Sequence, residues 1–373
     1  MKKPLLAGAA VVAVACTAAI AAPAYATGHP GGAPTTTDPV TITSGLVTPL
    51  SLEVDRQRVA YLSQNFAGLL TRVARDGTTS VLASAPGEEI TAVSSRDDVV
   101  YYAQIAQDHS SGALMSVPAV GGTPTQVADL FAYESSANPD AAQSYGFQGV
   151  SAECAAQFPP PGPMSSPAYY SGIVDIHPYA SLALNNAIFV ADAGANAITR
   201  VNYDGAVSTV AVLPPQAPIA VTAEQLAALG LPACAAAYPY VAEPVPTDIE
   251  IGPDGWLYVT TLPGGPEDPT LGARGSVYKV NQKTGEVKLV AAGFTTATGL
   301  AVDPAGTIYV SELFGGPTGS GQISVLKKGQ STPSVLTAVP GPTAIEVRSN
   351  RLFVSTSSLD ETGAASLSLI EVH

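Results

Sequence analysis

A pattern of short, alternating apolar strands recurs along the chain and organises it. The clearest copy spans residues 246–259 (PTDIEIGPDGWLYV), in which Ile249 and Ile251 alternate with polar residues before a Pro-Asp-Gly turn and a second apolar run. Similar stretches return at residues 298–310 and 342–354. Paired short strands that repeat at roughly 45 to 50 residues are typical of the blades of a β-propeller.

Six such units can be counted, and each begins with a strand expected to lie nearest the axis. We expect these inner strands near residues 52–55, 91–93, 174–178, 246–251, 299–302 and 344–347. Five units have four strands joined by hairpin turns, whereas the last has only three. Residues 40–43 form an isolated strand that can complete the last unit and so remove a free sheet edge. The sequence therefore predicts an all-β, six-bladed β-propeller over residues 39–373, with the N-terminal strand closing the last blade.

Two segments, residues 131–170 and 214–245, do not fit the repeat. Each follows a fourth strand, so both connections should emerge on the same face in adjacent gaps. The second contains a short helix that Thr222 can cap. Each segment holds one cysteine, Cys154 or Cys234, and such a pair usually forms a disulfide in an oxidising compartment, with two unpaired thiols as the alternative. We expect two short helical insertions, joined by this disulfide, to form a lid over part of that face.

The N-terminus has the organisation of a secretory signal peptide. A basic start leads into an apolar run over residues 5–22, and a small-x-small pattern ends at residue 26. We predict a signal peptide at residues 1–26, a flexible Pro- and Gly-rich tail at 27–38, and a secreted, extracellular protein without membrane insertion. Pro23 and the many alanines argue against a transmembrane anchor. Cys16 leaves lipoprotein processing as an open alternative.

The chain is strongly acidic, and this limits its partners. It carries 30 Asp and Glu residues against 16 Lys and Arg residues, which gives a formal net charge of −14. Such a charge repels phosphate backbones and anionic lipids, so nucleic-acid binding is disfavoured. The negative charge favours the binding of cations. With nucleic acids and anionic lipids disfavoured, we expect the partner to be a small molecule or a protein.

Carboxylates recur at one position of the predicted inner strands. Aligning these strands gives the column Glu53, Ala92, Asp175, Glu250, Ala301 and Glu346. Carboxylates that share a channel raise one another's pKa unless something offsets their charge. Ca²⁺ prefers oxygen ligands and would do so, and we therefore predict Glu53, Asp175, Glu250 and Glu346 as metal ligands. His177 and Asp248, next to the column, would extend a ligand-binding site. Backbone N–H groups, Arg partners or water are the alternatives.

The loops that join second and third strands form another candidate surface, because they share a face with the insertions. They include Asp108, His109 and residues 192–196. The motifs G-x-S-x-G, H-E-x-x-H and C-x-x-C are absent from the sequence. No catalytic residue can be named on this basis. A metal-dependent hydrolase needs only carboxylates, Asn and an activated water, so that class of enzyme stays open.

Two stretches carry a resemblance to a known family. Residues 246–265 (PTDIEIGPDGWLYVTTLPGG) and 298–316 (TGLAVDPAGTIYVSELFGG), with the isolated N-terminal strand and the secretion signal, resemble the ScyD/ScyE family of secreted proteins. Residues 189–198 also resemble an NHL repeat, although Ala197 stands where such repeats often carry Arg. The resemblance implies a six-bladed propeller and little about chemistry.

Two functions are compatible with these features. The first is a secreted, non-catalytic propeller that binds a small molecule or a protein on its lidded face. The alternative is a metal-dependent hydrolase or lactonase, by analogy with gluconolactonase-type propellers, which the chain resembles in blade count and which use acidic and Asn ligands in the channel.

Overall fold

The computed structural model describes residues 34–160, 167–266 and 269–373. The predicted signal peptide, including Cys16, lies outside the described residues, as does most of the predicted tail. The last part of that tail is paired with the C-terminus: the backbone N–H groups of Thr35 and Thr37 donate to the carbonyl oxygens of His373 and Glu371. Among the residues described, no helix is long and apolar enough to cross a bilayer.

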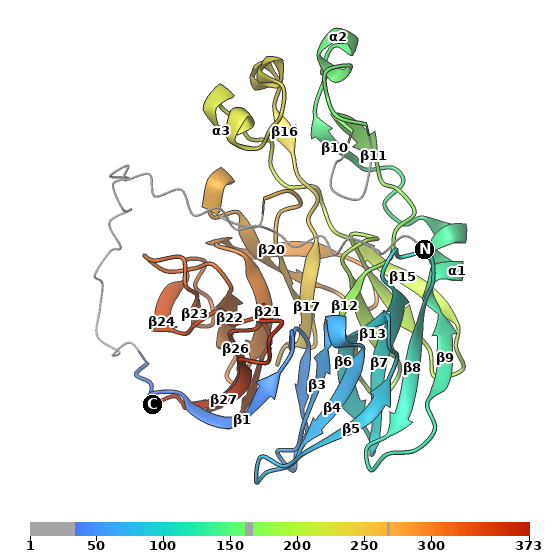
Figure 1. Cartoon of the computed structure of the whole chain (residues 1–373), viewed down its shortest axis with the longest axis vertical. Helices are drawn as coiled ribbons and strands as arrows, with labels where there is room; N and C mark the ends of the chain where they lie inside the picture. Colours follow the sequence, from blue (N-terminus) through green and yellow to red (C-terminus); the bar gives the residue numbers. More distant parts are fainter. Residues whose placement is uncertain (1–33, 161–166, 267–268) are drawn as a thin grey trace. The chain divides into compact units, whose positions relative to one another are not determined.

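The described residues form an all-β fold with six four-stranded antiparallel sheets, named here first to sixth in chain order (Figure 1). The first three contain β2 (Leu52–Val54), β3 (Ala60–Gln64), β4 (Leu69–Val73), β5 (Thr79–Ser84); β6 (Glu88–Arg96), β7 (Val99–Ala106), β8 (Gly112–Pro118), β9 (Thr125–Asp129); and β12 (Pro178–Ala183), β13 (Ile188–Asp192), β14 (Ala197–Val201), β15 (Val207–Val212). The last three contain β17 (Pro246–Ile251), β18 (Leu257–Thr261), β19 (Gly275–Val280), β20 (Val287–Phe294); β21 (Ala297–Val302), β22 (Ile308–Glu312), β23 (Gln322–Leu326), β24 (Ser334–Ala338); and β25 (Ile345–Arg348), β26 (Arg351–Thr356), β27 (Ala365–Glu371), β1 (Val40–Leu46). Short 3₁₀ helices η1 (Asn65–Ala67) and η3 (Pro269–Leu271) lie in connections.

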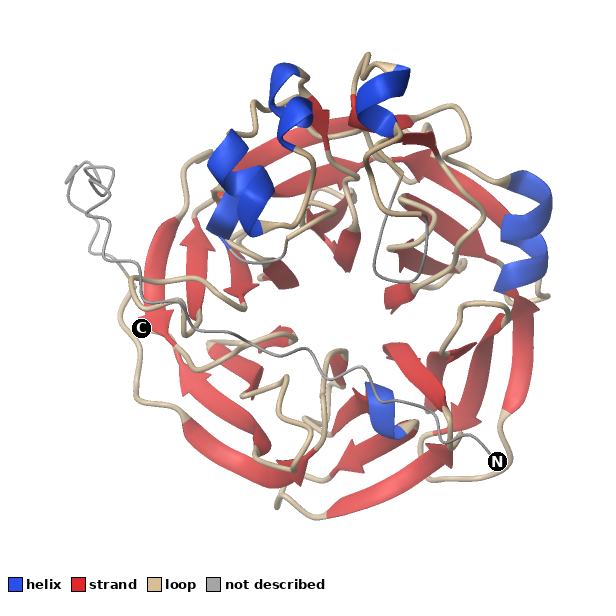
Figure 2. Ribbon diagram, turned by 45° about the horizontal axis from the view of Figure 1, so that its top comes forward, coloured by secondary structure: helices blue, strands red, loops and turns tan. Residues whose placement is uncertain are grey.

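The first strands of the six sheets contact one another in a closed cycle. β2 contacts β6, and the contacts continue through β12, β17, β21 and β25 back to β2. Figure 2 shows the sheets following one another around a centre in this way. The N-terminal strand β1 pairs antiparallel with β27, with Val40 opposite Leu369, as the sequence predicted. The fold is therefore a β-propeller whose last sheet combines the first and the last strands of the described residues.

Apolar side chains fill the spaces between neighbouring sheets. Leu70 and Tyr61 of the first sheet pack with Ile90 of the second, and Phe189 of the third packs with Ile249 of the fourth. These residues come from the alternating pattern seen in the sequence, because successive side chains of a strand point to opposite faces. The repeated stretches thus form the core, and the turns and loops are left to carry the polar groups.

The pairing of the third sheet corrects one prediction. In the fourth sheet Glu250 lies opposite Tyr258, but in the third sheet the residue opposite the equivalent aromatic, Phe189, is Leu182. The strand β12 begins only at Pro178, so Asp175 precedes it and is not in the carboxylate column. Residues 174–178 alternate like a strand in the sequence, which explains the error.

A β-bulge causes a second shift in the column. The register of β6 changes between Thr91 and Ser94, and Ser94, not Ala92, lies opposite Tyr101. Ala92 has φ +52°, in the left-handed region that a regular strand does not use. The residues that occupy equivalent positions are Glu53, Ser94, Leu182, Glu250, Ala301 and Glu346.

Most of the two insertions forms a small unit beside the sheets, whereas α1 (Leu130–Ala137) contacts β8 and β15. The insertions contain α1, β10 (Ser144–Phe147), α2 (Ala152–Ala155) and β11 (Tyr169–Ser171), and then α3 (Ala223–Ala228), η2 (Ala233–Ala237) and β16 (Tyr240–Val241). β10 pairs with both β11 and β16, and the predicted disulfide joins Cys154 to Cys234. Thr222 caps α3 as expected. Figure 1 shows α2, α3, β10, β11 and β16 projecting together on one side of the sheets.

Candidate functional site

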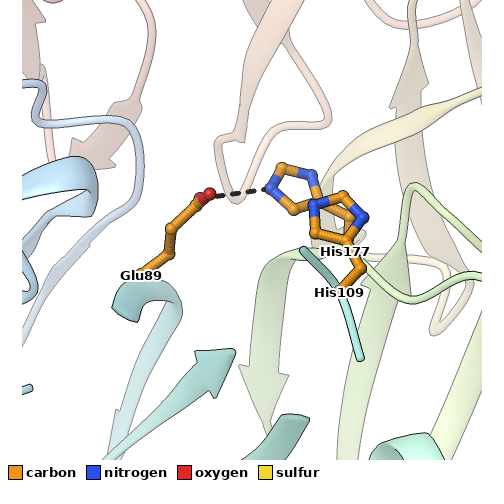
Figure 3. Close-up of side chains that lie close together, drawn as sticks. All are labelled: Glu89, His109 and His177. Carbon is orange, nitrogen blue, oxygen red and sulfur yellow. Dashed lines mark hydrogen bonds and ion pairs between the residues drawn. The ribbon is translucent and has the colours of Figure 1, made fainter. Parts of the chain in front are cut away.

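Two histidines and a glutamate meet where β6 and β12 begin, and we call Glu89, His109 and His177 the histidine cluster. Each residue offers one ligand atom, and these atoms all lie within 4.8 Å of one another. Figure 3 shows Glu89 pointing toward the two imidazole rings, with Oε2 of Glu89 3.4 Å from Nε2 of His177. The rings are stacked, with centroids 4.9 Å apart and an interplanar angle of 17°. The side chain of Glu89 is only 8% exposed, whereas those of His109 and His177 are 31% and 24% exposed, so solvent reaches the cluster from the histidine side.

Asp175 orients His109. Its Oδ1 lies 2.8 Å from Nδ1 of His109, which leaves Nε2 of that ring free to act as a ligand. The hydrogen bond to Asp175 raises the pKa of His109, and burial opposes this effect. Burial also acts to raise the pKa of Asp175, but the hydrogen bond and the charge of His109 outweigh it, and that pKa is lowered. The pair therefore behaves as a carboxylate and an imidazole held in a fixed orientation.

Asp192 holds the backbone that carries His177. Its Oδ1 accepts the backbone N–H groups of His177 at 2.8 Å and of Gly194 at 3.1 Å, so the end of β13 is tied to the segment before β12. A Cβ on Gly194 would come within 2.8 Å of the carbonyl group of Asp175. Burial raises the pKa of Asp192 to about 6, although the backbone hydrogen bonds oppose the rise. Glycine at position 194 thus permits the close approach that places Asp175 and His177.

The first insertion contacts this same segment. Glu134 of α1 is 2% exposed and lies close enough to Asp175 for the charges of the two carboxyl groups to interact. Burial raises the pKa of Glu134 to about 8, and the neighbouring carboxylates of Asp192 and Asp140 add to the rise. The first insertion therefore places a buried carboxyl group next to the segment that carries Asp175.

The donor set of the histidine cluster fits a divalent transition metal. Two imidazoles and one carboxylate are the ligands of many catalytic zinc sites, and a carboxylate on the second ring nitrogen is the usual support for a metal-binding histidine. Asp175 provides that support for His109. Because the two rings are nearly parallel, their in-plane lone pairs do not converge, and one ring must rotate about χ2 when both bind the same ion.

A second group of charges lies at the opposite ends of the inner strands. We call Glu53, Glu250, Glu346 and Arg348 the arginine cluster. The Nη2 atom of Arg348 lies 3.1 Å from Oε1 of Glu53, and its Nη1 atom lies 2.6 Å from Oε2 of Glu346. Glu250 lies near enough to Glu346 and Arg348 for the charges of both to act on its carboxyl group. One guanidinium therefore pairs with two carboxylates, and Arg348 is the Arg partner that was one alternative to calcium.

Burial controls the protonation of this group. Burial, reinforced by the charge of Glu346, raises the pKa of Glu53 to about 8, with Arg348 opposing. The pKa values of Glu250 and Glu346 are raised for the same first reason. The nearby Asp248 is hydrogen-bonded to the backbone: its carboxylate accepts hydrogen bonds from the N–H groups of Ile249 and Leu300. Burial raises the pKa of Asp248 to about 8.

The predicted site residues are thus divided between two places. The structure brings Glu53, Glu250 and Glu346 together, with Asp248 close by. It places His177 in the histidine cluster and Asp175 beside that cluster, against His109. Sequence reasoning did not predict Glu89 and His109 as members of the histidine cluster, or Arg348 as a member of the arginine cluster. His109 lay in a loop that was singled out, whereas Glu89 could have been found only from the two adjacent glutamates that open the second sheet, an unusual start for a buried strand.

Comparisons with known proteins support the fold. The chain matches no protein-family model, and no curated protein matches its sequence, so the resemblance to the ScyD/ScyE family is not confirmed. Among solved structures, it is similar to a PQQ-bound aldose sugar dehydrogenase from Streptomyces coelicolor, with 12% identity, a TM-score of 0.57, and coverage of 92% of this chain and 100% of that one. It is also similar to a gluconolactonase from Xanthomonas campestris, with 13% identity, a TM-score of 0.51, and coverage of 92% and 96%. At these identities the likeness concerns the propeller fold alone.

Proposed function

We propose that this protein is a secreted, six-bladed propeller hydrolase that opens lactones or related esters with a divalent metal ion held by Glu89, His109 and His177. The observation that carries the proposal is the placement of these three ligand atoms within 4.8 Å at a partly exposed position. In this account the six sheets are six blades over residues 39–373, residues 1–26 direct secretion, and the insertions 131–170 and 214–245 border the site.

The roles of the chain's own groups follow from their contacts. A bound divalent ion would supply Lewis acidity and lower the pKa of a water ligand. Asp175 would keep the proton of His109 on Nδ1, so that Nε2 would be available to hold the ion. Asp192 fixes the backbone of His177, and the buried carboxylate of Glu89 supplies the negative charge. The histidine side, which is the exposed side, is where a substrate would approach.

The choice of lactones rests on chemistry and on fold. One solved structure with the propeller fold is named a gluconolactonase, and sugar lactones are therefore the first substrate class to test. An uncharged polyhydroxy lactone also avoids the repulsion that the acidic chain would exert on an anionic substrate.

A test of this proposal measures binding and hydrolysis on the same samples. The purified protein is freed of metal with a chelator, titrated with Zn²⁺ by calorimetry, and assayed with glucono-δ-lactone and a p-nitrophenyl ester. We expect one Zn²⁺ per chain, and we expect His177→Ala and Glu89→Gln each to abolish hydrolysis and weaken zinc binding at least tenfold. His373→Ala is the matched control, because His373 contacts Thr35 through its backbone. Unchanged zinc binding in His177→Ala would refute the site.

Non-catalytic binding is the second candidate, and one feature of the insertions favours it. A hollow on the inserted unit is lined by apolar residues that include Val150, Phe158 and Tyr169, and Tyr169 is 45% exposed. A protein that binds one Zn²⁺ yet hydrolyses neither substrate would support this function over the hydrolase.

A further inference from the structure

The two insertions meet the third sheet through a buried acidic group that the hydrolase proposal does not use. We call Asp140, Asn196 and Glu243 the insertion cluster. Asp140 comes from the first insertion, Glu243 from the second, and Asn196 from the loop between β13 and β14. The Nδ2 atom of Asn196 donates to Oδ2 of Asp140 at 2.9 Å and to Oε1 of Glu243 at 3.2 Å. One neutral amide thus links two carboxylates of different insertions.

This group has more acceptors than donors. Asp140 is 1% exposed, yet its Oδ1 atom has no hydrogen-bond partner. The neighbouring Oε1 of Glu134 and Oδ1 of Asn138 are also buried without a partner. A buried acceptor left unpaired costs on the order of 1 to 3 kcal/mol, so this concentration of them indicates a missing donor or cation.

The charge of the group is also uncompensated. No Lys or Arg ion pair found in the described parts of the chain involves Asp140, Glu134 or Glu243. Burial raises the pKa of both Asp140 and Glu243, which is the response expected of carboxylates that lack a counter-charge. A water molecule could satisfy the unpaired oxygens, but it would leave the negative charge in place.

The orientation of the Asn196 amide decides what the group can bind. The oxygen and nitrogen of an Asn side chain can exchange places by a rotation of the terminal amide. After this exchange the oxygen of Asn196 would take the place from which the nitrogen now reaches both carboxylates. Asp140, Glu243 and Asn196 would then present oxygen ligands alone, which is the donor set of a hard cation.

We propose that Asp140, Asn196 and Glu243 bind a Ca²⁺ ion that ties both insertions to the third sheet. Ca²⁺ accepts irregular sets of carboxylate, amide and carbonyl oxygens, whereas Mg²⁺ requires a nearly ideal octahedron. The site differs from the histidine cluster in both residues and ligand chemistry. If no calcium binds here, the hydrolase proposal is unaffected. If the hydrolase proposal fails, the calcium site is unaffected.

Terbium luminescence tests the proposal, because Tb³⁺ replaces Ca²⁺ and is sensitised by nearby aromatic rings. The hydroxyl group of Tyr145 donates to Oδ2 of Asp140 at 3.0 Å, so a bound ion would lie close to that ring. We expect saturable luminescence that Ca²⁺ displaces. We also expect Asp140→Asn to weaken Tb³⁺ binding at least tenfold and Glu89→Gln to leave it unchanged. Absence of saturable luminescence, or equal binding by Asp140→Asn, would overturn the proposal.

A second variant keeps the test decisive if Asp140→Asn does not fold. Asn196→Asp adds a third carboxylate to the cluster. If a cation binds there, this variant should have a lower thermal midpoint than the wild type in a chelator and should regain most of that loss in millimolar Ca²⁺. Asp254→Asn, at a surface turn, is the control and should show no calcium-dependent shift beyond that of the wild type. If the amide acts only as a hydrogen-bond donor, the loss in Asn196→Asp will be the same with and without Ca²⁺, and the proposal is refuted.

Discussion

Removal of Arg348 tests the description of the arginine cluster. The substitution Arg348→Met keeps an unbranched apolar stem but deletes the guanidinium that contacts Glu53 at 3.1 Å and Glu346 at 2.6 Å. The side chain of Glu346 is 4% exposed and that of Glu53 is 13% exposed, so water cannot replace the lost partner fully. The variant therefore leaves two buried carboxylates, and Glu250 beside them, without a cation.

The expected cost follows from the burial of the pair. Breaking a buried ion pair by removing one partner costs about 3 to 5 kcal/mol of unfolding free energy. Arg348 is itself 30% exposed, which places the expected loss near the lower end, about 3 kcal/mol at pH 8. The loss should shrink toward pH 5, because the carboxyl groups then take up protons and no longer need the guanidinium.

Urea unfolding followed by fluorescence measures this loss. Trp256 is the one tryptophan in the chain, and it lies under Lys279 and Lys288, so its emission should change when the fourth sheet opens. Arg351→Met is the matched control: Arg351 pairs with Glu371 at 2.9 Å, but both side chains are 35% exposed, and such a pair contributes about 1 kcal/mol or less. Equal losses in Arg348→Met and Arg351→Met, or a loss in Arg348→Met that does not depend on pH, would refute this account of the cluster.

Three further outcomes are expected. The unfolding free energy of the wild type should fall as pH rises from 5 to 8, by about 1.4 kcal/mol per pH unit for each proton involved. The reason is that the raised pKa values of Glu53 and Asp248 keep these groups protonated in the folded state, whereas the unfolded chain releases its protons near about pH 4 to 5. Urea titrations at several pH values would check this, and a rise in stability would contradict it. Replacing both Cys154 and Cys234 with serine should lower the free energy of unfolding by up to about 4 kcal/mol, the chain-entropy value for a loop of 80 residues. Hydrogen exchange should then increase first in the insertions. Unchanged exchange there would contradict their dependence on the disulfide. Gly194→Ala should weaken zinc binding at least tenfold in calorimetry, because its Cβ would displace the carbonyl group of Asp175, and normal binding would refute the positioning argument.

The fold was predictable because it rests on periodicity. Alternating apolar residues and turn signals located the strands of the propeller, and the isolated N-terminal strand led directly to its pairing with β27. The disulfide followed from two cysteines in two insertions on one face. Periodicity could not predict which residue of each strand occupies the equivalent position in its sheet. A bulge at Ala92 and the late start of β12 at Pro178 each moved a residue out of the predicted column.

The candidate sites were less predictable because they depend on contacts between distant residues. The sequence singled out His177, but its partner Glu89 lies 88 positions earlier. Asp175 was chosen for a strand position that it does not occupy, yet it supports His109 from the segment before that strand. Arg348 follows its partner Glu346 by two positions, but Glu53 lies 295 positions away, and only closure of the cycle of sheets brings the two together. Side-chain partners of this kind come from the closed fold and not from local pattern.

Anomalous diffraction at the zinc absorption edge, from crystals of the metal-free protein soaked in Zn²⁺, tests the central claim most directly. The account predicts one strong peak per chain, about 2.0 to 2.2 Å from a ring nitrogen of both His109 and His177 and from a carboxylate oxygen of Glu89, with one imidazole ring rotated from its stacked position. No peak at these residues, or a peak held by Glu53, Glu250 and Glu346 instead, would contradict it.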